Sequence, residues 1–199
     1  AFGEDWYWST SGQHLDANWD VERVADPGQT VLVLPTGPAD ELESCGLFFV
    51  HSIHAARNRV WIASPYFVPE KDVLSALKLA ALRGVDVRIL LPAKADHQLV
   101  FWSSFSFIAE TEAAGVKFYR YQPGFMHQKV MLVDDDFAAV GTANLDNRSF
   151  RLNFEITVAV CGRQFAAEVE KMLTTDFAES RQVDADELHR RPLWFRFAV

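Results

Sequence analysis

The sequence contains little cysteine and no long apolar segment. Only Cys45 and Cys161 occur among its 199 residues, and they form no C-x-x-C or other zinc-binding spacing. We expect both to be buried thiols in a reducing compartment. No run approaches the roughly 18 consecutive apolar residues of a membrane-spanning helix. A disulfide-framed scaffold and a membrane span within this sequence are therefore excluded.

Positive charge is also scarce. The chain has 19 Lys and Arg against 27 Asp and Glu, which gives a net charge of −8. This balance argues against nucleic acid as a partner, because such proteins usually present a broad basic face. If the ligand is an anion, its positive charge must be local. The remaining composition is ordinary, with 49% hydrophobic residues and 16 Phe, enough for one domain with a large core.

The chain divides near residue 26. Aromatic residues are scattered without a clean period over residues 1–19, and Asp26-Pro27-Gly28 is a turn sequence. We therefore expect an irregular lead-in over 1–26 and a domain over 27–199.

Apolar runs alternate with helical spacing through the domain. Strands are expected at 31–34, 60–63, 85–91, 116–121, 129–133, 137–140 and 155–160, and helices at 41–57, 70–83, 97–114 and 163–180. The first strand, ended by Pro35, is predicted to be buried. Only three aspartates separate 129–133 from 137–140, which predicts a hairpin. Strands separated by helices need crossover connections, so we predict an α/β fold with a mixed β-sheet sandwiched between helices.

The residues that carry chemistry lie at 127–144. His127 and Lys129 are two positions apart on a predicted central strand, so both side chains leave one face. Imidazole can attack an electrophile or move a proton near neutral pH, and the ammonium can hold an anion beside it. Asn144 adds an amide, and the Gly141–Asn144 turn adds backbone N–H groups. This set suits a phosphodiester and needs neither a metal nor a cofactor.

The spacing of these residues resembles a known signature. His127, Lys129, Asp134, Gly141 and Asn144 match H-x-K-x4-D-x6-G-x-x-N, the pattern of the phospholipase D superfamily. The segments 64–69, 83–87, 145–150, 152–155 and 191–194 resemble the carboxyl-terminal catalytic half of bacterial cardiolipin synthases. Residues 4–8 resemble the tail that follows the first catalytic half in that family.

The resemblance implies a phosphatidyltransferase half-domain. Family members carry two signatures and build one active site where the halves meet, whereas this sequence has one. A second catalytic half, or a second copy of the chain, would thus be the partner. Two phosphatidylglycerol molecules would form cardiolipin through a phosphohistidine intermediate. The intact protein is expected at the bacterial cell membrane, and this piece of it is expected to be soluble.

The resemblance also assigns roles to single residues. His127, Lys129, Asn144 and Glu155 are the expected catalytic residues, with Glu155 bonded to the far ring nitrogen of His127 from a neighbouring strand. The expected substrate-binding residues are Thr142, Arg148 and Tyr66, the last because it follows the carboxyl end of a strand. Asp134 and Gly141 are expected to be structural, since Asp favours turns by accepting from backbone N–H groups.

Other functions stay open at this point. A phospholipase D-type hydrolase or nuclease completed by homodimerisation would use water as acceptor, although the charge of −8 weighs against a nuclease. A non-catalytic lipid-binding half is the third alternative. The aromatic residues at 101–107 form either core or an apolar rim for acyl chains. The basic and aromatic tail at 190–196 suits either a membrane surface or a packed terminus.

Overall fold

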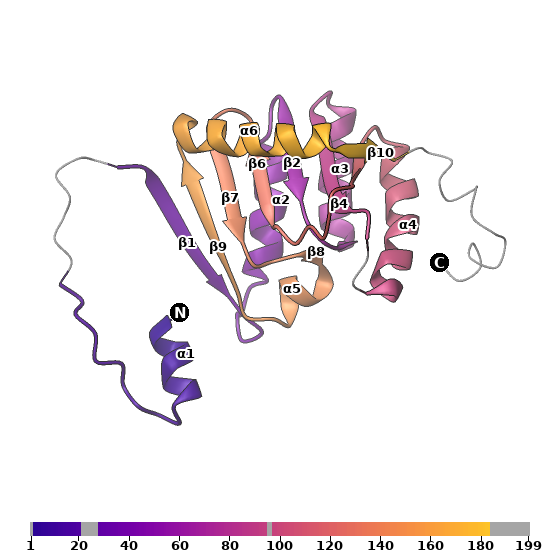
Figure 1. Ribbon diagram of the computed structural model, residues 1–199. Coiled ribbons are helices and arrows are strands. Elements are labelled where there is room, and N and C mark those ends of the chain that lie inside the picture. The colour runs from indigo at the N-terminus through magenta and orange to yellow at the C-terminus, as the bar shows by residue number, and fades with distance from the viewer. Residues whose placement is uncertain (1, 21–27, 95–96, 184–199) are drawn as a thin grey trace.

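A mixed sheet of eight strands forms the centre of the protein (Figure 1). The computed structural model describes residues 2–20, 28–94 and 97–183. The sheet contains β1 (Thr30–Thr36), β2 (Arg59–Ala63), β4 (Asp86–Pro92), β5 (Lys117–Tyr121), β6 (Val130–Val133), β7 (Phe137–Gly141), β9 (Glu155–Cys161) and β10 (Ser180–Gln182). The helices are α1 (Phe2–Ser9), α2 (Ser44–Ala55), α3 (Lys71–Leu82), α4 (Gln98–Glu112), α5 (Asn147–Arg151) and α6 (Arg163–Ala178).

The order of the strands explains why helices are needed between some of them. The sheet runs β1-β9-β7-β6-β2-β4-β5-β10. Strands β2, β4 and β5 are parallel, so α3 and α4 form the crossovers, whereas the other neighbours pair antiparallel. The hairpin between β6 and β7 turns at Asp134–Asp136, as predicted. The predicted α/β class with a mixed sheet between helices is confirmed.

Strand alternation divides the core into two layers. Ile62, Met131 and Ala159 face the helices α2 and α3, whereas Trp61 and Leu132 face α6. Figure 1 shows α6 crossing one face of the sheet while α2 and α3 lie behind the other. Burying a side chain such as Leu132 contributes about 1.5–3 kcal/mol, so these layers fix the position of the central strands.

The first strand differs from its prediction. Val31, Leu32 and Val33 are 50–54% exposed, and β1 is an edge strand of the sheet, paired with β9. Pro35 lies within β1, which an edge strand tolerates because its outward groups need no ladder partner. The expectation of a buried strand was therefore wrong.

The two cysteines also differ from each other. Cys45 is buried in α2, and burial raises the pKa of its thiol to about 11. Cys161 ends β9 and is exposed, so the prediction of two buried thiols holds for only one of them.

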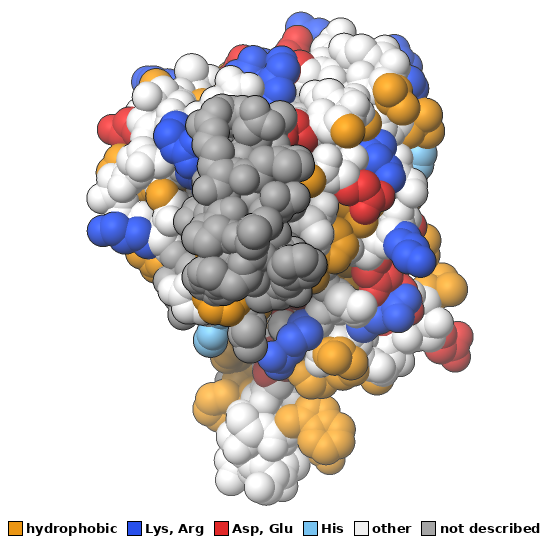
Figure 2. Space-filling model, turned by 90° about the vertical axis from the view of Figure 1, so that its right-hand side faces the viewer, with side chains coloured by type: hydrophobic (Ala, Val, Ile, Leu, Met, Phe, Trp, Pro, Cys, Tyr) orange, Lys and Arg blue, Asp and Glu red, His pale blue; other side chains and the backbone are white. Residues whose placement is uncertain are grey.

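The lead-in contains a helix where irregular backbone was expected. Helix α1 has no buried residue, and in Figure 1 it lies apart from the sheet. The domain division at residue 26 stays a prediction, and the tail at 190–196 lies outside the described residues. Within the described ranges, no helix is both long and apolar enough to cross a bilayer. Figure 2 shows one face of the molecule, on which acidic and basic side chains are interspersed.

Candidate active site

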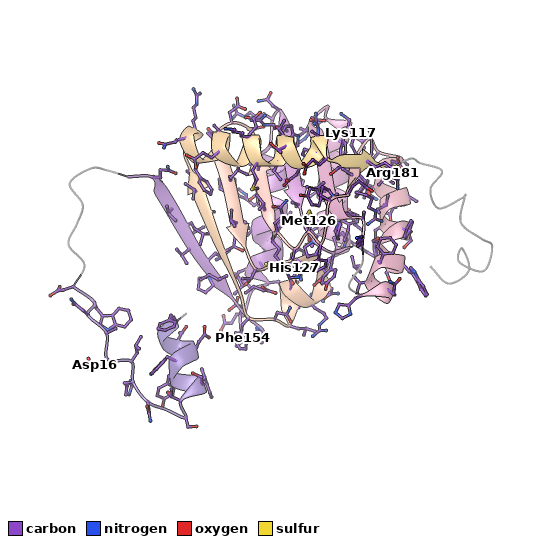
Figure 3. The ribbon with its side chains drawn as sticks, viewed as in Figure 1. Asp16, Lys117, Met126, His127, Phe154 and Arg181 are labelled. Atoms are coloured by element: carbon purple, nitrogen blue, oxygen red, sulfur yellow. The ribbon has the colours of Figure 1, made fainter. Side chains whose placement is uncertain are left out.

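His127 and Lys129 lie in the extended segment directly before β6. Both were predicted on the strand itself, but the ladder begins only at Val130, which pairs with Ala63 and Val140. The backbone N–H of Gly141 donates to the carbonyl of Lys129 at 3.1 Å, so the segment is still tied to the hairpin. His127 is exposed at the lower edge of the sheet in Figure 3. Both residues therefore lie at the amino-terminal end of the central strand β6, where His127 is exposed.

The two side chains are in direct contact. Lys129 Nζ lies 2.8 Å from His127 Nδ1 and 3.3 Å from Nε2, and it donates to the His127 carbonyl at 2.8 Å. An ammonium group only donates, so the ring nitrogen it bonds is the acceptor. A nucleophile or base and a cation therefore stand within one hydrogen bond of each other, which is the arrangement an anionic electrophile requires.

Asn144 lies in a loop fixed by the buried serines Ser64 and Ser149. Its backbone N–H donates to Ser149 Oγ at 3.1 Å, and the next N–H, of Leu145, donates to Ser64 Oγ at 3.0 Å. Asn144 Oδ1 is buried and has no hydrogen-bond partner within the described part of the chain. An unsatisfied buried polar atom costs about 1–3 kcal/mol, so this amide is suited to meeting a ligand group.

Lys129 and the Asn144 loop border a common hollow. Its polar lining comes from Ser64, Lys129 and Thr157, and Ala143 and Leu145 line it on either side of Asn144. The short strand β8 (Leu145–Asp146) pairs in parallel with β3 (Phe67–Val68) and holds this loop next to the end of β2. Neither short strand was predicted.

Gly141 and Thr142 join β7 to β9. A Cβ on Gly141 would lie 2.5 Å from the Ile156 carbonyl oxygen and 2.9 Å from Thr157 Cα, so no side chain fits there. The N–H of Thr142 donates to the Ile156 carbonyl at 3.0 Å, and Thr142 Oγ1 accepts from the Ile156 N–H at 3.0 Å. Thr142 therefore holds the end of β7 against β9 through its two bonds to Ile156. A contact of Thr142 with substrate stays a prediction.

Glu155 is not bonded to His127. In the described residues its carboxylate accepts from Asn153 Nδ2 at 3.1 Å, and no hydrogen bond reaches the imidazole. The expectation of a neighbouring-strand contact was wrong because β7 lies between β9 and β6. Strands two places apart are separated by roughly 10 Å. An orienting role for Glu155 stays a prediction.

Asp134 closes the other end of β6. Its carboxylate accepts from the backbone N–H groups of Arg57, Asn58 and Arg59 at 2.7–3.3 Å. Burial raises the pKa of Asp134, but these three donors outweigh burial and hold the pKa below its ordinary value. Asp134 has a φ of 50°, in the left-handed region that Asp tolerates in turns. Arg59 adds contacts to the Asp134 carbonyl and to Glu170 of α6.

The remaining candidates lie elsewhere. Tyr66 is next to the His97 ring, with centroids 6.2 Å apart, and it lines a second hollow together with Phe101 and Arg120. Arg148 is exposed on α5. The Arg120 guanidinium lies 4.6 Å from the Phe101 ring centroid, and Phe105 is buried, so at least part of the 101–107 cluster packs within the protein.

Sequence reasoning missed one aromatic neighbour of the site. The ring of Phe125 is stacked on His127, with centroids 5.5 Å apart and planes inclined by 22°. Phe125 lies two positions before His127 in an extended segment, which places both side chains on the same side of the chain. This spacing was the signal that could have predicted the contact. In the described ranges, no three His, Cys, Asp or Glu side chains are grouped so that they could hold a metal ion.

Comparisons with known proteins show which family this chain resembles. A family model described as "Cardiolipin synthase, PLD-like domain" matches residues 49–177. Cardiolipin synthase A of Pseudomonas putida (strain W619) is 53% identical over 193 residues, covering 96% of this chain and 40% of that protein. Cardiolipin synthase A of Pseudomonas aeruginosa (strain LESB58) is 54% identical over 190 residues, covering 94% and 38%. The chain therefore spans about 40% of the length of these curated relatives.

Solved structures share the fold at low sequence identity. Nuc from Salmonella typhimurium, a phospholipase D family member, superposes with a TM-score of 0.67 at 18% identity, covering 78% of this chain and 99% of that chain. Phosphatidylserine synthase of Haemophilus influenzae Rd KW20 has a TM-score of 0.65 at 17% identity, covering 94% and 47%. At these identities the likeness establishes the fold alone.

Proposed function

This chain belongs to the family of phospholipase D-like domains of cardiolipin synthase, and on that premise we propose that it supplies one of two halves of a phosphatidyltransferase site. The observation that carries the proposal is the contact of 2.8 Å between His127 Nδ1 and Lys129 Nζ at an exposed edge of the sheet. We assign the chain to the carboxyl-terminal half of the longer protein. The substrate is phosphatidylglycerol at a membrane surface.

The first step transfers the phosphatidyl group to the enzyme. One imidazole attacks phosphorus, a P–N bond forms, and the P–O bond to glycerol breaks. The imidazole of the other half, in its protonated form, gives its proton to the departing glycerol oxygen. His127 performs one of these two roles, and the counterpart histidine performs the other.

The second step reverses the proton movement. The imidazole that gave its proton now accepts one from the free hydroxyl of a second phosphatidylglycerol. The resulting alkoxide attacks phosphorus, a P–O bond forms and the P–N bond breaks, which releases cardiolipin and the free histidine. The balance is two phosphatidylglycerols to one cardiolipin and one glycerol.

The other residues of this half serve the phosphoryl oxygens. Lys129 leaves its bond with the imidazole and binds a negatively charged oxygen, since two unit charges 4 Å apart attract by about 4 kcal/mol at an effective dielectric near 20. The Asn144 side chain donates from Nδ2 to another phosphoryl oxygen, since its Oδ1 can only accept. Thr142 and Arg148 contribute to substrate binding, whereas Asp134 and Gly141 act by holding the hairpin.

Turnover of phosphatidylglycerol by the full-length protein tests the proposal. In vesicles, the wild type should release cardiolipin and glycerol in equal amounts, and a chelator should leave the rate unchanged. The 199-residue chain should also be assayed, once light scattering has established that the sample is monomeric. It should be nearly inactive, because it supplies one of the two histidines.

Three outcomes would contradict the proposal. Phosphatidic acid as the main product would make the protein a hydrolase with water as acceptor. Activity lost on chelation and restored by a divalent metal would exclude the phosphohistidine mechanism. Cardiolipin formation by the monomeric chain at the full-length rate would exclude the composite site.

A further inference from the structure

The imidazole of His127 is contacted on two sides by its own segment. Lys129 Nζ lies at the ring edge, within 2.8 Å of Nδ1, and the ring of Phe125 covers one face. The planes of Phe125 and His127 are inclined by only 22°, so the contact is a stack rather than an edge approach. Phe125 is itself 56% exposed, and the next residue, Met126, is buried in the core layer below α6. Met126 therefore anchors the segment from which both rings project.

A reactive imidazole needs a fixed plane, because its ring nitrogen must point at phosphorus along the line of the leaving oxygen. A carboxylate often supplies this orientation, but Glu155 is bonded to Asn153 here. Lys129 cannot supply it throughout the reaction that we propose, because it leaves the ring to bind the phosphoryl group. Only the face contact with Phe125 is then left among the described contacts of the His127 ring.

We infer that Phe125 is a positioning residue, which holds the imidazole plane of His127 by stacking while Lys129 is engaged with the phosphoryl group. This role rests on the proposed function and adds to it a residue outside the H-x-K signature. Stacking fixes the tilt of the ring but leaves both nitrogens free at its edge. It is therefore compatible with His127 acting either as nucleophile or as acid.

Kinetics of the full-length protein test the positioning role. Phe125→Leu keeps an apolar side chain but removes the flat face, and misoriented reacting groups lose rate steeply. We expect kcat on phosphatidylglycerol to fall about tenfold, with KM unchanged within about twofold. Phe125→Tyr restores the face and should retain at least about half of the wild-type kcat. Phe154→Leu is the matched control, because Phe154 is 78% exposed and lies near the same edge in Figure 3.

A spectroscopic measurement on the 199-residue chain tests the contact independently of activity. The His127 ring is stacked on Phe125 with centroids 5.5 Å apart, so ring currents should displace the NMR signals of its protons. Phe125→Leu should abolish this displacement, whereas Phe125→Tyr and Phe154→Leu should preserve it. An absent displacement in the wild type would overturn the inference.

The two proposals fail in different ways. The positioning role is overturned if Phe125→Leu has the wild-type kcat or changes KM alone. It is also overturned if Phe125→Tyr does not restore kcat, or if Phe154→Leu lowers kcat as much as Phe125→Leu does. If the product is phosphatidic acid, the proposed transferase function fails. The same comparison of kcat, made on hydrolysis, then still decides the role of Phe125.

Discussion

The two ends of strand β6 carry residues of one sequence signature, but the side chains at these ends differ in exposure and in hydrogen bonding. Before the strand, His127 is exposed, its ring nitrogen lies 2.8 Å from Lys129 Nζ and its ring is stacked on Phe125. After it, the Asp134 carboxylate accepts from three backbone N–H groups. Four buried residues, Val130–Val133, separate these two ends.

The difference separates chemistry from architecture within the signature. A side chain whose hydrogen bonds are satisfied by the backbone is unavailable to a substrate, whereas a ring held by stacking on its face keeps its nitrogens available. Asp134 fixes where β6 ends relative to β2, because Arg59 begins β2 and donates to it. The position of His127 at the opposite edge then follows from the length of the strand. Mutations at the two ends should therefore separate activity from stability.

Substitution at the open end should have the largest effect. His127→Ala in the full-length protein should lower cardiolipin formation by a factor of about 1,000 or more. The two histidines act together in the covalent and proton-transfer steps, so losing one of them disables both steps. The melting temperature should stay unchanged, since no core contact is removed. His51→Ala, at an exposed histidine of α2, is the control and should be active. A His127→Ala variant with wild-type turnover would contradict the assignment.

Substitution at the closed end should show the opposite pattern. Asp134→Ala should destabilise the 199-residue chain by about 2 kcal/mol, because it removes charge-assisted bonds to three backbone N–H groups. Equilibrium denaturation in urea measures this loss. Asp136→Ala, in the same turn and exposed, should change stability by less than about 0.5 kcal/mol. Equal losses at Asp134 and Asp136 would show that the turn, and not the carboxylate, is responsible.

Gly141 tests the junction between the site and the sheet. Gly141→Ala should destabilise the chain by about 1–3 kcal/mol, because the new Cβ would meet the Ile156 carbonyl oxygen at 2.5 Å. Gly124→Ala is the matched control, since a Cβ there has no heavy atom within 4 Å. A wild-type melting temperature for Gly141→Ala would mean that β7 and β9 can separate without cost.

Much of the architecture could be predicted from local pattern, and the contacts between elements could not. The apolar runs gave β2, β4, β5 and the β6–β7 hairpin, because strand period and turn residues are local properties. The exposure of β1 could not be seen, since an apolar run does not reveal whether a strand is at an edge. The missing bond between Glu155 and His127 has a similar cause, because the sequence does not say that β7 separates their strands. Short elements such as β3 and β8 contain too few residues to show a period.

Acid should remove the stabilisation that Asp134 gives to the fold, and this is the smallest effect expected. Three N–H donors hold the pKa of Asp134 below its ordinary value in the folded chain, although burial opposes them. An unfolded Asp has a pKa of about 3.9. The stabilisation from Asp134 is therefore complete above that value and is lost as the pH falls through the lower folded pKa. Melting temperatures of wild type and Asp134→Asn should differ by a constant amount from pH 7 to about pH 5 and should converge below about pH 4. Asp136→Asn should follow the wild type over the same range. A difference that grows as the pH falls would mean that the protonated form of Asp134 is the one that the fold stabilises.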